Sequence, residues 1–305
     1  MVDESLQAAL RGVNFVTATP FTGADGDVNT AAIKRNVRGL VDAGADVIIP
    51  CGGVGEYYSL SADERVDVVE ATVDAVAGNA RVLGGVGGPT RSAIELVEEY
   101  AAVGADGVML MFPQRPSLHR DGLVLHYRAI VESTELGVML YKKDHRLDAQ
   151  VLGEIATHEN VIAVKHAVGD INAFVKDVND VQDDLVWIDG NAEVPAVSFG
   201  VEGADGFTTG IGNFVPELPL ALMDAIHAGN WTRARRLREL ARPFQELRGA
   251  VPGSTGVGVV KHGMDVAGFE GGPVRPPLHP MAPAHQTQVE ELYDTVVADL
   301  EAVAA

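Results

Sequence analysis

The sequence contains one cysteine, few lysines and no long apolar segment. The single thiol, Cys51, excludes an internal disulfide and a cysteine metal cluster. No apolar run reaches about 18 residues, so we expect no membrane-spanning helix. Residues 1–10 are acidic and lack the apolar core of a signal peptide, so we expect a cytoplasmic protein.

Positive charge is scarce relative to negative charge. The chain has 43 Asp and Glu against 23 Lys and Arg, which gives a formal net charge of −20. A surface of this sign repels nucleic acid phosphates and anionic lipid, so we expect neither nucleic acid nor a membrane as a partner. Strong acidity with only six lysines is also typical of halophilic proteins, because high salt screens the repulsion between acidic groups.

Motifs for metals and organic cofactors are also missing. The nine histidines form neither H-x-H nor H-E-x-x-H. Neither a G-x-S-x-G nucleophile elbow nor a dinucleotide-binding fingerprint occurs. The sequence therefore predicts neither a metal site nor a cofactor.

Eight short apolar runs rich in β-branched residues alternate with amphipathic, helix-like segments. Continuous apolar runs suit parallel strands that are covered on both faces. The runs lie at 13–18, 46–50, 81–86, 106–112, 137–141, 161–165, 185–189 and 205–209. The helical segments between and after them lie at 30–43, 61–77, 90–103, 121–133, 148–158, 171–181, 192–199, 217–228, 231–247, 256–267 and 286–302.

Eight such units predict an α/β protein with a (β/α)8 TIM barrel and a C-terminal helical extension. We place the barrel at residues 1–228 and the extension, packed on the barrel, at 229–305. The alternative is a doubly wound sheet, which usually has about five to seven strands. The S-A-D-E sequence at 61–64 predicts a capping box at the start of one helix.

The active site of such a barrel lies at the carboxyl ends of the strands. The run at 161–165 ends in Lys165. Burial disfavours an ammonium group, and a neutral lysine is a nucleophile that forms a Schiff base with a carbonyl carbon. Two alternatives remain for Lys165, which are a buried pair with a carboxylate and a side chain that reaches water.

Two further features lie at strand ends. Tyr141 ends the run at 137–141 and could move protons beside an imine, although it could also be a core tyrosine. The G-G-V-G-E sequence at 52–56 could bind an anion through backbone N–H groups, or could form only a tight turn. We expect Glu56 to orient this loop rather than to act on a substrate.

Seven motifs occur in order along the chain. They are T-P-F (19–21), G-G-V-G-E-Y-Y-S-L (52–60), G-V-G-G-P-T-R (85–91), Y-K-K-D (141–144), V-K-H-A-V-G-D (164–170), G-N-F-V-P-E (212–217) and G-G-P-V-R-P-P-L (271–278). In this order they resemble the dihydrodipicolinate synthase / N-acetylneuraminate lyase superfamily of Schiff-base (β/α)8 lyases, over residues 12 to 290. Within it, the motifs are most similar to the 5-dehydro-4-deoxyglucarate dehydratase branch.

The resemblance implies roles for individual residues. Lys165 corresponds to the imine-forming lysine and Tyr141 to the proton-transfer tyrosine. Gly53 and Val54 correspond to residues whose backbone amides bind the substrate's α-keto carboxylate. A further pair, Thr208 and Thr209, falls where the dehydratases have two serines that line the site.

Two of the departures from the family pattern concern the predicted site. Val54 replaces the usual threonine, so the proton relay must run through water or another hydroxyl, such as Thr208 or Thr209. Lys142 and Lys143 follow the tyrosine where the dehydratases have Asn-Arg. Together with Arg146, they suggest a substrate whose distal end carries a carboxylate or a phosphate.

The resemblance implies a cofactor-independent lyase for 2-keto-3-deoxy sugar acids. We expect a dehydratase of the 5-dehydro-4-deoxyglucarate or 2-keto-3-deoxy-pentonate type, acting in sugar-acid catabolism. The alternative is an aldolase of the 2-keto-3-deoxy-(phospho)gluconate type, which gives pyruvate and an aldehyde. A third interpretation is a keto-acid-binding protein without catalysis. Superfamily members are mostly dimers or tetramers, so we expect a homo-oligomer.

Overall fold

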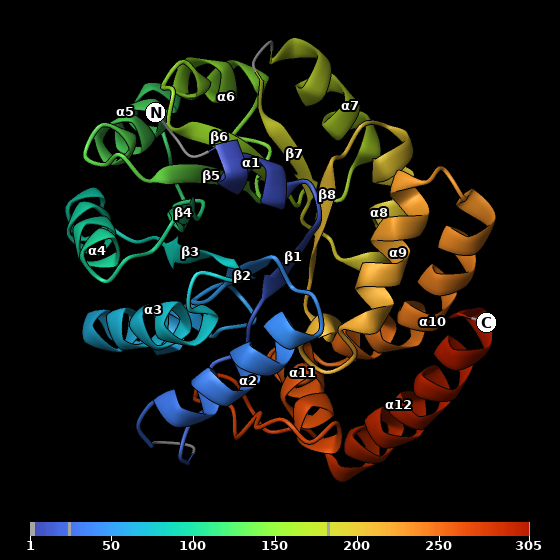
Figure 1. Cartoon of the computed structure of the whole chain (residues 1–305). Helices are drawn as coiled ribbons and strands as arrows, with labels where there is room; N and C mark the ends of the chain where they lie inside the picture. Colours follow the sequence, from blue (N-terminus) through green and yellow to red (C-terminus); the bar gives the residue numbers. More distant parts are fainter. Residues whose placement is uncertain (1–3, 24–25, 182–183, 305) are drawn as a thin grey trace.

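Eight parallel strands close into a barrel in the computed structural model, which describes residues 4–23, 26–181 and 184–304 (Figure 1). Each strand pairs with the next in the sequence, and β8 pairs with β1. The predicted (β/α)8 barrel is confirmed, and the doubly wound alternative is wrong. The strands are β1 (Val13–Val16), β2 (Val47–Ile49), β3 (Arg81–Val86), β4 (Gly107–Leu110), β5 (Gly137–Lys142), β6 (Val161–His166), β7 (Val186–Asp189) and β8 (Gly206–Thr209).

A helix follows each strand and packs on the outside of the barrel (Figure 1). The predicted capping box is present, because Ser61 accepts from the Glu64 N–H and Glu64 accepts from the Ser61 N–H. Single 3₁₀ turns, η1 (Tyr57–Ser59) and η2 (Ile211–Asn213), follow β2 and β8. The barrel helices are α2 (Thr30–Asp42), α3 (Ala62–Val76), α4 (Thr90–Ala102), α5 (Arg120–Val131), α6 (Ala149–Ala156), α7 (Ile171–Asp180), α8 (Glu193–Val201) and α9 (Glu217–His227).

Three C-terminal helices follow α9 and contact one another. They are α10 (Trp231–Ala250), α11 (Thr255–Val266) and α12 (Pro283–Ala304). Because α10 also packs against α8 and α9, the three helices lie on one side of the barrel instead of surrounding it (Figure 1). The segment between α11 and α12 contains the proline-rich stretch 273–283.

The structure differs from the predicted elements mainly at their ends. A helix that was not predicted, α1 (Glu4–Leu10), precedes β1 and contacts β6 and β7. The first strand ends at Val16 rather than at Ala18, because the Ala18 N–H donates to the Asn213 side chain instead of to a neighbouring strand. Part of the acidic N-terminal stretch, residues 1–3, lies outside the described residues.

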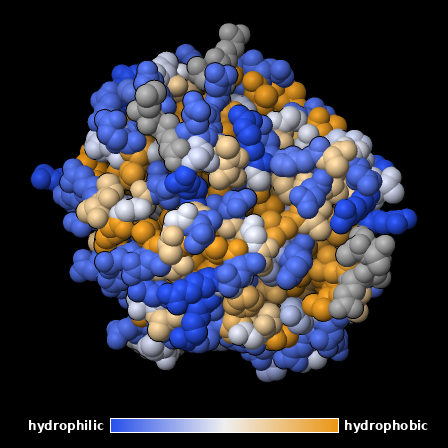
Figure 2. All heavy atoms as spheres, viewed as in Figure 1, coloured by the Kyte–Doolittle hydropathy of each residue, from blue (hydrophilic) through white to orange (hydrophobic). Residues whose placement is uncertain are grey.

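Every residue of β1, β2, β4, β6, β7 and β8 is buried, which explains their continuous apolar runs. Hydrophilic residues are spread over the face shown in Figure 2, with apolar residues visible between them. Within the described ranges, no helix is long and apolar enough to cross a membrane. In the same ranges, no group of three or more His, Cys, Asp or Glu residues could hold a metal ion.

Candidate active site

Lys165 lies near the carboxyl end of β6, and only 4% of the residue is exposed. The pairing of β5 with β6 sets Tyr141 directly beside Lys165. The Lys165 Nζ lies 4.3 Å from the centre of the Tyr141 ring. Gly190, just after β7, leaves room for the lysine stem, since a Cβ there would lie 2.9 Å from the Lys165 Cγ. The fold thus brings the amine and the phenol together at this opening of the barrel, here called the mouth.

The amine of Lys165 makes no hydrogen bond and no ion pair among the described residues. Burial, together with the positive charge of Lys143, lowers the pKa of Lys165 to about 7, although the Asp189 carboxylate acts in the opposite direction. The other two buried lysines, Lys142 and Lys261, each pair with a carboxylate. Neither alternative left open by the sequence describes Lys165, which is neither paired nor exposed. A neutral amine in this position is a nucleophile for a carbonyl carbon.

A cavity of about 460 Å³ opens beside Tyr141 at the mouth. Burial raises the pKa of Tyr141 to about 12, so its hydroxyl keeps its proton at neutral pH. A protonated phenol beside an amine can donate a proton to a leaving group. The cavity is lined by Gly53, Tyr58, Met111, Phe112, Pro113, Gln114, Arg115, Pro116, Tyr141, Lys143, Asp144 and Arg146.

The loop after β2 presents two neighbouring backbone N–H groups. Those of Gly53 and Val54 donate to no acceptor within the described part of the chain. The Glu56 N–H donates to the Gly53 carbonyl at 3.3 Å and closes the turn. Gly55 lies so close to β1 that a Cβ would be 2.9 Å from the Thr17 carbonyl oxygen. Adjacent free N–H groups of this kind can hold a carboxylate.

The two threonines at the end of β8 point to opposite sides. The Thr208 hydroxyl lies 3.4 Å from the Asp189 carbonyl oxygen. The Thr209 hydroxyl donates to the Glu193 carboxylate on α8, outside the strands, and accepts from the Gly212 N–H at 2.8 Å. Since successive strand side chains alternate between faces, the structure does not bring the two hydroxyls together as the predicted lining pair.

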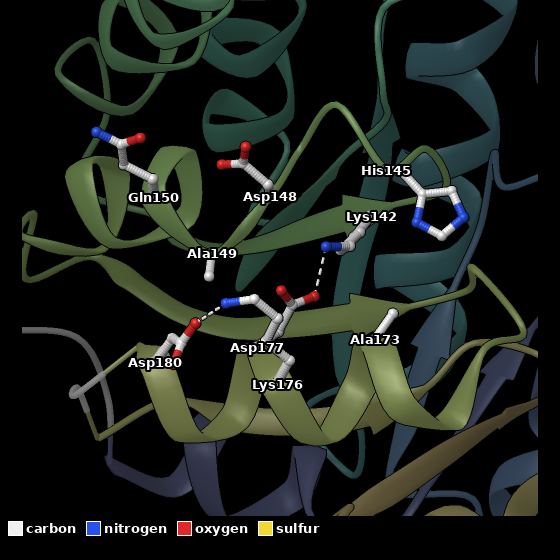
Figure 3. Close-up of a pocket in the computed structure, with 9 residues that line it drawn as sticks. All are labelled: Lys142, His145, Asp148, Ala149, Gln150, Ala173, Lys176, Asp177 and Asp180. Carbon is white, nitrogen blue, oxygen red and sulfur yellow. Dashed lines mark hydrogen bonds and ion pairs between the residues drawn. The ribbon is translucent and has the colours of Figure 1, made fainter.

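Lys142 is the last residue of β5, one position beyond the predicted run at 137–141, and it does not line the cavity at the mouth. Its ammonium forms a buried ion pair with Asp177 of α7 (Figure 3). The His166 Nε2 lies 3.1 Å from the same carboxylate. The structure thus places the Lys142 ammonium away from the mouth, where the expected contact with the substrate would lie. The reason is the alternation along β5, which turns Tyr141 to the mouth and the next residue to the helices.

Replacement of Lys142 by methionine is expected to destabilise the protein and to leave kcat/KM nearly unchanged. Loss of the ammonium leaves the Asp177 carboxylate buried without its cation, which costs about 3 to 5 kcal/mol. The matched control is Lys176→Met, in a separate pocket that Lys142, Asp177 and Lys176 all line (Figure 3). It removes an exposed ion pair with Asp180 and should cost less than about 0.5 kcal/mol. Urea unfolding and steady-state kinetics measure both effects, and a large loss of kcat/KM in Lys142→Met would contradict the assignment.

Lys143 lines the cavity in place of Lys142, together with Arg146. The Arg146 guanidinium donates to both carboxylate oxygens of Asp144, at 2.9 and 2.7 Å, so its charge is largely neutralised. Lys143 has no hydrogen bond or ion pair in the described ranges, and its charge acts on Lys165. Side-chain alternation along β5 is the signal that separates the two lysines. Two other lining residues, Arg115 and Tyr58, were not predicted as site residues, although Tyr58 lies within the G-G-V-G-E-Y-Y-S-L motif.

The fold and the site together define a class of protein, namely (β/α)8 barrels that hold a buried lysine beside a tyrosine at the mouth. The chain belongs to the dihydrodipicolinate synthetase family, a family of lyases, whose sequence profile matches residues 9–295. The resemblance seen in the motifs is thereby confirmed.

Curated relatives cover nearly the whole chain. A probable 5-dehydro-4-deoxyglucarate dehydratase of Variovorax paradoxus is 31% identical over 278 residues, which is 90% of this chain and 91% of that protein. A protein of the same description from Pseudomonas entomophila is 31% identical over 303 residues, which is 96% of this chain and 98% of that protein.

Solved structures of similar proteins carry a different name. A dihydrodipicolinate synthase from Bacillus clausii superposes with a TM-score of 0.91 at 33% identity, covering 95% of this chain and 99% of that one. The dihydrodipicolinate synthase from Oceanobacillus iheyensis gives a TM-score of 0.92 at 30% identity, covering 96% and 99%. The backbone of this chain is thus that of the synthases, whereas the curated relatives named above are dehydratases.

Proposed function

We propose that this protein is a Schiff-base dehydratase of 2-keto-3-deoxy sugar acids, with 5-dehydro-4-deoxyglucarate as the first substrate to test. The observation that carries the proposal is the buried amine of Lys165. It lies against Tyr141 and forms no ion pair with a carboxylate in the described part of the chain. The descriptions of the curated relatives favour dehydration over the synthase activity named for the solved structures.

In the proposed mechanism, the neutral amine of Lys165 attacks the C2 keto carbon, and the carbinolamine loses water to give an iminium. The N–H groups of Gly53 and Val54 hold the adjacent carboxylate. The iminium withdraws electrons, so a proton passes from C3 to a water molecule and an enamine forms. The enamine then expels the C4 hydroxyl, which takes a proton from Tyr141 and leaves as water.

The later steps depend on the substrate. With a glucarate derivative, loss of the distal carboxyl group as carbon dioxide follows dehydration. Hydrolysis of the imine then releases the product and restores the amine of Lys165. Lys143 supports a substrate with an anionic distal end, because it is a cation on the cavity wall that pairs with no carboxylate among the described residues.

Val54 supplies no hydroxyl, so another group must return the proton to Tyr141. We propose that Thr208 or a water molecule does so. Thr209 is a poorer candidate, because its hydroxyl is engaged by Glu193 and by the Gly212 N–H.

Product identification tests the proposal. With 5-dehydro-4-deoxyglucarate we expect 2,5-dioxopentanoate, carbon dioxide and water, detected by mass spectrometry and carbon dioxide release. A 2-keto-3-deoxy-pentonate tested in parallel shows whether the distal carboxylate is required. Pyruvate plus an aldehyde would establish the aldolase instead. Absence of turnover across the panel, with no borohydride-trapped adduct on Lys165, would overturn Schiff-base chemistry altogether.

A further inference from the structure

A second buried ion pair lies behind the loop at 52–56. The Lys261 Nζ, from α11, lies 2.6 Å from the Glu56 Oε1, and the two side chains are 2% and 0% exposed. The same ammonium donates to the Pro273 carbonyl at 2.6 Å and lies 4.2 Å from the centre of the Phe21 ring. Glu56 is therefore held by groups that come from the C-terminal part of the chain.

Arg275 binds the same region from the segment between α11 and α12. Its backbone N–H donates to the Glu56 Oε2 at 2.9 Å. Its guanidinium donates to both carboxylate oxygens of Glu64, at 2.9 and 2.7 Å, and to the Ser59 carbonyl at 3.0 Å. Both oxygens of Glu56 are thus occupied by C-terminal groups, and the start of α3 is tied to the same segment.

The conformation of Glu56 connects this cluster to the free N–H groups of the loop. Glu56 has a φ of 55°, which is unfavourable for a residue with a Cβ, so surrounding contacts must maintain it. Its N–H donates to the Gly53 carbonyl, and this bond helps to orient the peptide groups of Gly53 and Val54. A buried ion pair contributes little to stability, because the cost of desolvation offsets the attraction. What Lys261 and Glu56 supply is a fixed loop geometry.

We propose that Glu56 and Lys261 are positioning residues for the substrate carboxylate, and that the C-terminal segment completes this half of the active site. The inference rests on the proposed function, because it takes the Gly53 and Val54 N–H groups to bind the carboxylate of a 2-keto acid. Without the ion pair the loop can shift, and these N–H groups are then no longer aligned to donate hydrogen bonds to the carboxylate. Lys165 lies on β6 and is not in contact with the pair, so imine formation with an uncharged ketone is unaffected.

The test traps the Lys165 imine with borohydride over a range of concentrations of two probes, pyruvate and the uncharged ketone hydroxyacetone. The variant Glu56→Gln with Lys261→Met removes both charges, so that neither is left buried alone. We expect the pyruvate concentration for half-maximal trapping to rise about 10- to 100-fold, since a small misplacement of binding groups has effects of this size. The hydroxyacetone concentration for half-maximal trapping should not change.

Two further variants complete the design. Glu56→Gln alone keeps the shape of the side chain and should shift the pyruvate dependence in the same direction by a smaller factor, which provides the test if the double variant does not fold. The matched control is Lys142→Met with Asp177→Asn, which removes the other buried lysine–carboxylate pair, between β5 and α7. In this control, the concentrations of pyruvate and of hydroxyacetone for half-maximal trapping should both stay unchanged.

The outcomes separate the inference from the proposed function. A rise for pyruvate alone supports the positioning role. An unchanged pyruvate dependence in the folded variants overturns it while leaving the Schiff base intact. An equal rise for both probes also overturns it, because the pair would then support the whole mouth rather than the carboxylate. If the parent protein forms no adduct with either probe, the proposed function fails first and the inference fails with it.

Discussion

Replacement of Lys165 by methionine is expected to abolish turnover, with kcat/KM lowered by about 10⁴-fold or more, because the covalent step loses its nucleophile. The other buried amines cannot substitute, since Lys142 pairs with Asp177 and Lys261 with Glu56. Borohydride treatment with a 2-keto acid should label the parent on Lys165 and leave the variant unlabelled. Turnover at the parental rate, or a parental yield of adduct on another lysine, would contradict the assignment.

The same replacement is expected to stabilise the fold at neutral pH. The pKa of Lys165 falls from 10.5 to about 7 on burial, so the unfolded chain binds the proton more tightly than the folded one. The buried amine therefore lowers the free energy of unfolding by its full amount below pH about 7, and this loss of stability disappears as the pH rises to about 10.5. One pKa unit corresponds to about 1.4 kcal/mol, so Lys165→Met should gain about 2 to 4 kcal/mol at neutral pH.

Two pH measurements check this account of Lys165. Urea unfolding of parent and variant should converge as the pH approaches the ordinary lysine pKa. In the parent, kcat/KM should rise with pH through about 7, as the amine becomes neutral. A parental activity that is flat across this range, or a Lys165→Met variant that is less stable than the parent at neutral pH, would show that the amine is not desolvated as described.

Replacement of Tyr141 by phenylalanine is expected to lower kcat by about 10²- to 10⁴-fold while the imine still forms. The ring that lies against the Lys165 Nζ is retained, and only the hydroxyl that carries the proton is lost. Burial raises the pKa of Tyr141 to about 12, so the group acts as a proton donor at neutral pH rather than as a phenolate. Single-turnover kinetics with borohydride trapping separate the two steps.

Tyr127→Phe is the matched control for this prediction. The Tyr127 hydroxyl is also buried, but it lies on α5, and its one hydrogen-bond partner within the described ranges is the Met111 carbonyl, at 3.5 Å. We expect kcat to change little in this control. A Tyr141→Phe variant that keeps full kcat would assign proton transfer to another group, and one that forms no imine would give the phenol a part in the first step.

Most of the fold could be predicted from local patterns. Eight apolar runs and the helical segments between them were enough for the barrel, since a strand covered on both faces needs an unbroken apolar run. Element ends were less well predicted. The first strand stops at Val16 because Asn213, far away in the sequence, takes the Ala18 N–H. The helix at Glu4–Leu10 was missed, because its seven residues are too few to show a clear helical period.

The candidate site could be predicted in part. Lys165 and Tyr141 were identifiable because each ends an apolar run, and a closed barrel brings all strand ends to one mouth. The prediction of Lys142 as a substrate contact neglected alternation along the strand, which turns its ammonium to Asp177. Thr208 and Thr209 were treated as a pair for the same reason, although the Thr209 hydroxyl turns to Glu193 on α8.

By itself, the sequence determined that this chain forms a barrel and that an amine and a phenol end neighbouring strands, because both conclusions depend on residues close together in the chain. Only the tertiary structure decided which buried lysine forms no ion pair among the described residues. Lys142, Lys165 and Lys261 are all buried, and what distinguishes them is a carboxylate from a remote element, Asp177 for the first and Glu56 for the third. Such pairing depends on how distant segments pack, so a local sequence pattern does not predict it.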